Sequence, residues 1–108
     1  MRTHQEIDAR SLELHRLIAS KVRREPALLD RVRLTLQRWR DPANPSRAEP
    51  YLAEWERLMA NGPEQLLAAA VEDSERAAVL RQCSPFAGIL APAERFAFLK
   101  DWAARHAA

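Results

Sequence analysis

Glycine, cysteine and strand-forming residues are all scarce in this chain, which contains two glycines, one cysteine, four valines, three isoleucines and two threonines. Alanine, leucine, arginine and glutamate dominate instead, and this composition favours α-helices. The 108 residues are enough for one domain. We therefore expect an all-α fold, with five to six helices in a single compact domain over residues 1–108.

The single cysteine, Cys83, excludes an internal disulfide and a metal site of four thiolates. A catalytic cysteine needs a base beside it, and no histidine is close to Cys83 in the sequence. There is no glycine-rich phosphate loop, and no serine–histidine–aspartate order suggests a nucleophile. We therefore expect a protein that is not an enzyme and that needs no cofactor.

The histidines and the apolar segments exclude two further classes of site. His4 and His15 are separated by eleven positions, or about 16 Å along a helix, too far to share one metal ion. His4 with Asp8 supplies two ligands, whereas zinc takes three or four. No apolar run approaches the roughly 18 residues that span a bilayer, and the first residues are polar. We expect a cytoplasmic protein without a metal or a membrane partner.

Local signals divide the chain into helices. Thr3 and Glu6 fit a capping box, and Ser46 with Glu49 repeats the pattern. The pair Asn61-Gly62 is typical of a helix end, and prolines suit first helical turns. The expected helices cover residues 3–24, 26–40, 46–61, 63–71, 73–82 and 92–105, the fifth of them capped by Asp73 or Ser74.

Apolar residues recur at helical spacing in the first three of these helices. We expect the core to contain Ile7, Leu14, Leu17, Ile18, Leu28, Leu29, Val32, Leu36, Trp39, Tyr51, Leu52, Trp55, Leu58 and Met59. Leu12 is expected away from the core side of the first helix.

Charge is divided unevenly along the chain. Residues 16–40 hold eight basic and two acidic residues, a local charge of +6 in a chain whose total is +2. Residues 51–75 hold six acidic residues and one arginine, a local charge of −5. Such a division predicts a charged partner or a homodimer in which the basic part of one copy faces the acidic part of the other. The same charges could also pair within one chain.

One helix face carries a possible contact surface. Arg31, Leu34 and Arg38 lie together on the helical wheel, away from the core stripe. An exposed leucine between two arginines fits a contact with a partner, and it also fits an ordinary solvent-exposed face.

The same region could bind nucleic acid, because phosphate binding requires several basic side chains on one surface. The arginines available for it are Arg23, Arg24, Arg31, Arg33 and Arg38. Side chains that read base edges are few here, with only Thr35 and Gln37 at hand. The turn at Glu25-Pro26 also lacks the glycine that helix-turn-helix motifs often contain.

Arg95 falls on the apolar side of the last helix, between Leu99 and Trp102 on the wheel. An arginine there must extend to solvent or find a carboxylate. We expect a structural ion pair with the acidic segment at residues 72–75, and an anion-binding site is the alternative.

The corner before the last helix has a physical interpretation of its own. Ser84 can cap a turn that Pro85 begins, Phe86 is then directed inward, and Gly88 permits a backbone geometry that other residues resist. We therefore expect Phe86, Gly88 and Arg95 to have structural roles.

The segment Glu72-Asp73-Ser74-Glu75, the run from Leu80 to Leu90 and the pair Glu94-Arg95 resemble a group of small helical bacterial proteins. The resemblance covers roughly residues 5–102. Some members of this group are the small partner in toxin–antitoxin-like gene pairs. The resemblance implies a role in the fold or in partner contact for Ser84 to Arg95, and it implies no catalytic residues.

Three functional hypotheses remain. The first is a non-enzymatic module that binds another protein, of the antitoxin-like kind. The second is a DNA-binding regulator that uses the basic second helix. The third, a small enzyme, would require a deep pocket lined by Arg95, Glu72 and Asp73.

Overall fold

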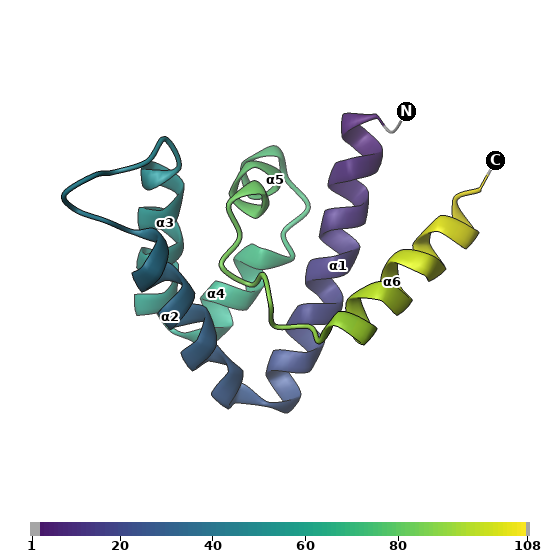
Figure 1. The fold of residues 1–108 in the computed structure, drawn as a ribbon, viewed down its shortest axis with the longest axis horizontal. Helices are drawn as coiled ribbons and strands as arrows, with labels where there is room; N and C mark the ends of the chain where they lie inside the picture. Colours follow the sequence, from purple (N-terminus) through teal and green to yellow (C-terminus); the bar gives the residue numbers. More distant parts are fainter. Residues whose placement is uncertain (1–2, 108) are drawn as a thin grey trace.

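The computed structural model describes residues 3–107, and within this range the chain is built from α-helices without a β-strand (Figure 1). The elements are α1 (His4–Arg24), a 3-10 turn (Pro26–Leu28), α2 (Leu29–Trp39), α3 (Glu49–Ala60), α4 (Pro63–Ala70), α5 (Glu75–Gln82) and α6 (Pro92–Arg105). The predicted all-α fold is confirmed.

The helix ends follow the local signals in most places. The Thr3 side chain accepts a hydrogen bond from the amide of Glu6, and Ser74 accepts one from Ala77. Gly62 has a φ of 111°, a backbone conformation that suits glycine, and Pro63 starts α4 directly after it.

The predicted capping box at Ser46 and Glu49 is wrong. The Ser46 hydroxyl accepts from the amide of Ala48, two residues on, and α3 begins only at Glu49. Ala48 takes the N-cap position without a side-chain hydrogen bond. The Glu49 carboxylate is not free to cap, because it pairs with the Arg40 guanidinium.

The long helix α1 is the element on which the others assemble (Figure 1). It meets α2 at the 3-10 turn in a V, and both α4 and α5 pack against it. Helix α3 packs on α2 and α4. The buried core unites side chains from all of these elements and from the segment after α5, including Ile18, Val22, Val32, Leu36, Leu52, Trp55, Leu66, Leu67, Leu80, Phe86 and Ile89.

Several core predictions are wrong. Trp39 and Tyr51 are 41% and 40% exposed, and Ile7 and Leu17 are also largely exposed. Leu12, which we expected away from the core, is buried. Leu12 is buried because α1 is contacted by both α4 and α5, so its buried surface includes more than the expected apolar stripe. Trp39 is the last residue of α2 and leaves the core where that helix ends.

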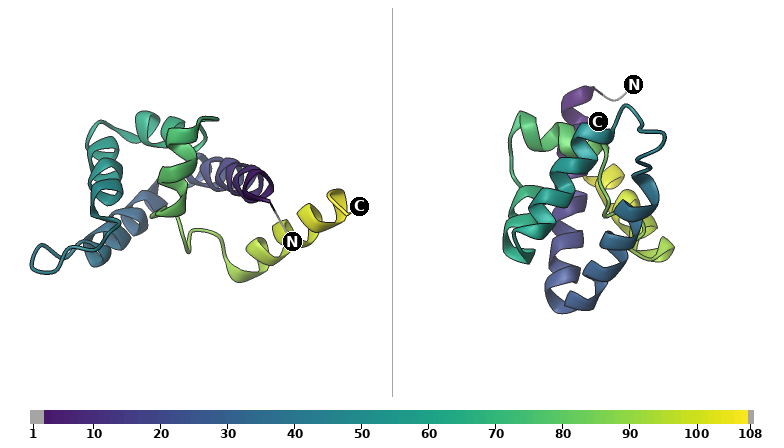
Figure 2. Two further views of the ribbon diagram at one scale, coloured as in Figure 1. Left: turned by 90° about the horizontal axis from the view of Figure 1, so that it is seen from above. Right: turned by 90° about the vertical axis from the view of Figure 1, so that its left-hand side faces the viewer.

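Helix α6 stands apart from the other helices and extends away from them (Figure 2). Trp102 is its buried anchor. Two ion pairs tie it to α1, Lys21 with Glu94 at 2.6 Å and Arg105 with Glu13 at 2.8 Å. Because so little of α6 is covered, apolar side chains on it remain in solvent.

Candidate binding cleft

A cleft of about 820 Å³ opens between α1, the α2–α3 connection and the segment that links α5 to α6. Its lining is Ser11, Leu14, His15 and Ile18 from α1, Trp39, Ser46, Ala48 and Leu52 from α2, the connection and α3, and Arg81, Gln82, Cys83, Ser84, Phe86, Ala87, Gly88, Leu90, Pro92 and Arg95 from the end of α5 onward. Clefts of 300–1,000 Å³ with mostly apolar walls are the usual size for ligand sites.

The corner at residues 84–88 shapes one wall of this cleft. Phe86 is 1% exposed and meets Trp55 edge to face, with ring centroids 5.8 Å apart. The Ser84 hydroxyl accepts from the amide of Phe86, and Gly88 has a φ of 86°. Phe86 is therefore directed inward as predicted, and the positive φ of Gly88 suits its glycine identity.

His15 and Ser84 form a hydrogen-bonded pair in the cleft lining. The Nδ1 atom of His15 lies 2.7 Å from the carbonyl oxygen of Ser11, and its Nε2 atom lies 2.7 Å from the Ser84 hydroxyl. A carbonyl oxygen only accepts, so Nδ1 carries the proton and the Ser84 hydroxyl donates to Nε2. Burial lowers the pKa of His15, against the Ser11 hydrogen bond, and nearby Arg81 lowers it further.

This pair joins residues 69 positions apart, and no signal in the sequence indicates it. A serine that donates to a neutral histidine is the first element of a nucleophile site. Here the Ser84 oxygen also accepts from the Phe86 amide, so it is held as part of the turn. The geometry shown by the pair is that of a structural link between α1 and the corner.

Arg81 is the buried cation of the cleft lining, at 6% exposure. Its Nη1 atom donates to the carbonyl oxygens of Ala70 at 3.2 Å and Glu72 at 2.8 Å. Its Nε atom has no hydrogen-bond partner within the described residues. Burial lowers the pKa of Arg81, and the carboxylates of Asp8, Asp73 and Glu72 act in the opposite direction. The Arg81 guanidinium thus caps backbone carbonyls at the C-terminal end of α4 and forms no salt bridge within the described residues.

The predicted ion pair of Arg95 is wrong. Arg95 is exposed, and its side chain makes no hydrogen bond or ion pair in the range 3–107. It lies on the same side of the helical wheel as Trp102, but Trp102 is buried whereas Arg95 is exposed and lines the cleft. The arginine that reaches the acidic segment is Arg81, and it binds backbone carbonyls there.

The small-enzyme hypothesis required Glu72 and Asp73 to line a pocket with Arg95. The cleft includes Arg95 and neither of these acids. Cys83 lies in the lining as a free thiol of intermediate exposure. Among the described residues, no group of three or more histidine, cysteine, aspartate or glutamate side chains is placed to hold a metal ion. No helix in that part of the chain is long and apolar enough to span a membrane.

The residues of the predicted contact face on α2, Arg31, Leu34 and Arg38, lie together in the structure. Arg31, Leu34, Gln37 and Arg38 line a second, shallower hollow of about 490 Å³, and Leu34 is 58% exposed. Arg31 also donates to the carbonyl oxygen of Gly88 at 3.0 Å. The α2 face therefore adjoins the corner that forms the cleft wall.

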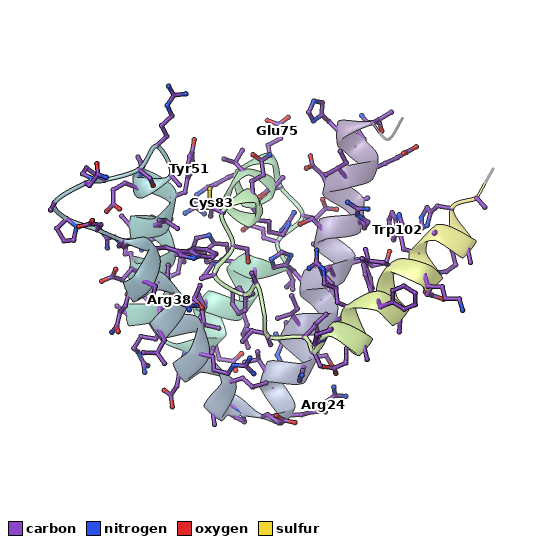
Figure 3. All side chains as sticks on the ribbon, in the orientation of Figure 1. Arg24, Arg38, Tyr51, Glu75, Cys83 and Trp102 are labelled. Atoms are coloured by element: carbon purple, nitrogen blue, oxygen red, sulfur yellow. The ribbon has the colours of Figure 1, made fainter. Side chains whose placement is uncertain are left out.

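The remaining basic side chains do not join this face. Arg23 and Arg24 are exposed at the end of α1, and Figure 3 shows Arg24 and Arg38 on different helices. Arg33 pairs with Asp30 at 2.8 Å. Thr35, one of the two side chains in this region that could have read base edges, is buried, and its hydroxyl donates to the carbonyl oxygen of Arg31.

The uneven charge is partly balanced within the chain. Arg40, from the basic part, pairs with Glu49 and with Glu56 of the acidic part. Glu54 pairs with Arg57 and Arg76, and these arginines lower its pKa. Among the described residues, the pair of Arg40 with Glu56 is the one ion pair that joins the basic stretch to the acidic stretch, and Lys21 and Arg33 pair with acids outside the acidic stretch.

Comparisons of the chain with protein-family models, with curated proteins and with solved structures give no match. The function is therefore argued from the cleft and its surroundings.

Proposed function

We propose that this protein is a non-enzymatic, cytoplasmic interaction module that holds an apolar segment of another protein in the cleft of residues 81–95 and α1. The observation that carries the proposal is the size of this largely apolar cleft, about 820 Å³, in so small a domain. Hydrophobic grooves of this kind receive apolar anchors from a partner, whose burial drives association.

The rim of the cleft supports a protein partner. Trp39 lines the cleft and is 41% exposed, although tryptophan is a residue that interfaces use as an anchor. Ala87 also lines the cleft and is exposed. A partner segment that covered Trp39 would bury apolar surface at about 25 cal/mol for each Å².

The resemblance of residues 72–75, 80–90 and 94–95 to small helical bacterial proteins agrees with this proposal. Part of that resemblance, the run from Arg81 to Arg95, is the segment that lines one side of the cleft. We extend the proposal to an antitoxin-like role, in which the protein is the small partner of a second, separately encoded protein. A homodimer is the other form that such an interaction can take.

The test is a pull-down of the tagged protein from its own host at low and at high salt, with protein and nucleic acid both read out. The cleft is blocked in Ala87→Trp, and Ala68→Trp adds the same bulk to an exposed position outside the cleft. We expect one partner that survives high salt, is retained by Ala68→Trp and is lost from Ala87→Trp. Equal recovery with both variants, each shown to be folded by circular dichroism, would refute docking in the cleft.

A second function, nucleic-acid binding by a regulator, is favoured by one observation. Arg31 and Arg38 flank Leu34 and Gln37 on one exposed face. Binding through phosphates should weaken steeply with salt, and charge reversal in Arg38→Glu should reduce the salt slope by about 1–2. Lys100→Glu, an exposed cation on α6, is the control. Salt-independent binding, or equal loss in both variants, would contradict this function.

A further inference from the structure

The charge of the cleft is one-sided. Of its eighteen lining residues, two are arginines, Arg81 and Arg95, and none is an aspartate or a glutamate. The whole chain has 15 acidic residues, so acids are not rare elsewhere. The cleft therefore combines apolar walls with two cationic groups and no anion of its own.

Arg81 supplies buried positive charge. A buried arginine is ordinarily paired with a carboxylate, since an uncompensated charge in the interior is costly. Here the polar partners are two backbone carbonyl oxygens, those of Ala70 and Glu72, and Nε is unpartnered within residues 3–107. Asp8, Asp73 and Glu72 favour its charged form through space. The charge of Arg81 in turn lowers the pKa of His15, so its positive charge is felt by another side chain of the cleft lining.

Arg95 supplies a guanidinium at the edge. It is exposed, it lines the cleft, and its side chain is without a polar partner among the residues described. The neighbouring Glu94 does not pair with Arg95. Its carboxylate oxygen Oε1 instead accepts hydrogen bonds from Lys21 Nζ at 2.6 Å and from the amide of Ala91 at 2.8 Å. The planar fork of Arg95 is therefore available for two parallel hydrogen bonds to a carboxylate.

We propose that the partner segment held in the cleft is acidic as well as apolar, with a carboxylate beside its apolar anchor that pairs with Arg95 within the field of Arg81. This inference rests on the proposed function and specifies the chemistry of the same site. An ion pair formed at the edge of an apolar cleft is less screened than one in open solvent. A neutral apolar segment would leave Arg95 without an anion.

The test uses two fluorescent probes that differ by one anionic group. 1-Anilinonaphthalene-8-sulfonate has an apolar aromatic body and a sulfonate that stands in for the carboxylate, and N-phenyl-1-naphthylamine has the same body without the charge. We expect the anionic probe to bind more tightly. Arg95→Gln should weaken the anionic probe by about 3- to 10-fold and leave the neutral probe unchanged.

Arg23→Gln is the matched control, because Arg23 is also an exposed helical arginine and lies outside the cleft. It should bind both probes as the unmodified protein does. Ala87→Trp should weaken both probes, because it fills the cleft itself. Circular dichroism and thermal melts confirm that each variant is folded before its affinity is interpreted.

The outcomes separate the two levels of the proposal. Equal affinity for both probes, or equal loss of the anionic probe in Arg95→Gln and Arg23→Gln, would overturn the preference for an acidic segment and leave apolar docking standing. Binding of both probes unaffected by Ala87→Trp would overturn the cleft as a docking site.

Discussion

Truncation of Phe86 should reveal how much the corner before α6 contributes to the fold. The ring is 1% exposed and contacts two others edge to face, Trp55 at 5.8 Å and His15 at 6.1 Å between centroids. Replacing a buried phenylalanine by alanine costs about 3–5 kcal/mol, the sum of lost transfer free energy and the cavity left behind. Each aromatic pair adds about 0.5–1.5 kcal/mol to what the ring contributes. We expect Phe86→Ala to lower the free energy of unfolding by about 3–5 kcal/mol.

Urea denaturation followed by tryptophan fluorescence measures this loss, because Trp55 lies against the ring and reports on its environment. Phe96→Ala is the matched control: Phe96 is 69% exposed on α6, and its truncation should change stability by no more than about 0.5 kcal/mol. A loss below about 1 kcal/mol in Phe86→Ala would show that Phe86 is not a core residue and would refute the reasoning. So would an equal loss in the two variants.

Three further perturbations test the cleft lining. Arg81→Met should lower stability by about 1–3 kcal/mol in the same urea assay, because the carbonyls of Ala70 and Glu72 lose their donor; an unchanged midpoint would contradict that role. Gly88→Ala should cost about 1–2 kcal/mol from its φ of 86° alone, since an added Cβ meets no atom within 4 Å; a gain in stability would contradict this. Burial lowers the pKa of His15, so the unfolded chain binds the proton more readily, and stability should fall as the pH drops through 6.5 toward the folded pKa. Urea melts from pH 7.5 to pH 5 should show a smaller loss in His15→Gln, and equal slopes would contradict the assignment.

The helices could be predicted because their boundaries depend on neighbours in sequence. Thr3, Ser74 and the pair Gly62-Pro63 act within three or four residues, and each marks a helix end in the structure. The failure at Ser46 has a tertiary cause. Glu49 would complete the box, but Arg40 competes for its carboxylate from another helix. A capping pattern in the sequence predicts a helix start reliably only where the capping side chain forms no ion pair with a residue distant in sequence.

The cleft could not be predicted because it depends on the position of α6. Arg95 and Trp102 do share a helix face, yet one is exposed and the other buried, and the wheel does not indicate this difference because it depends on how α6 is placed against the rest of the fold (Figure 2). The sequence does not distinguish Arg81 from the other arginines, because its hydrogen bond to the Ala70 carbonyl at the end of α4 depends on the tertiary structure. The contact of His15 with Ser84 spans 69 positions, and helical periodicity carries no information at that distance.

The corner at residues 84–89 connects the two candidate surfaces. Three side chains of α1 and α2 form hydrogen bonds with this corner: His15 with the hydroxyl of Ser84, Arg31 with the carbonyl of Gly88 and Lys21 with the carbonyl of Ile89. Arg31 lies at the same time in the exposed α2 face. Substitution of His15, Lys21 or Arg31 would therefore alter the fold, the cleft and the α2 face together.

This coupling decides which variants can separate binding from stability. Ala87 and Arg95 line the cleft, and neither side chain makes a hydrogen bond in the described part of the chain. Arg38 likewise lies in the α2 face without an ion pair within residues 3–107. Changes at these positions should leave the free energy of unfolding within about 0.5 kcal/mol of that of the unmodified protein. A partner lost from Ala87→Trp and Arg95→Gln but kept by Arg38→Glu would then assign binding to the cleft, and the reverse pattern would assign it to the α2 face.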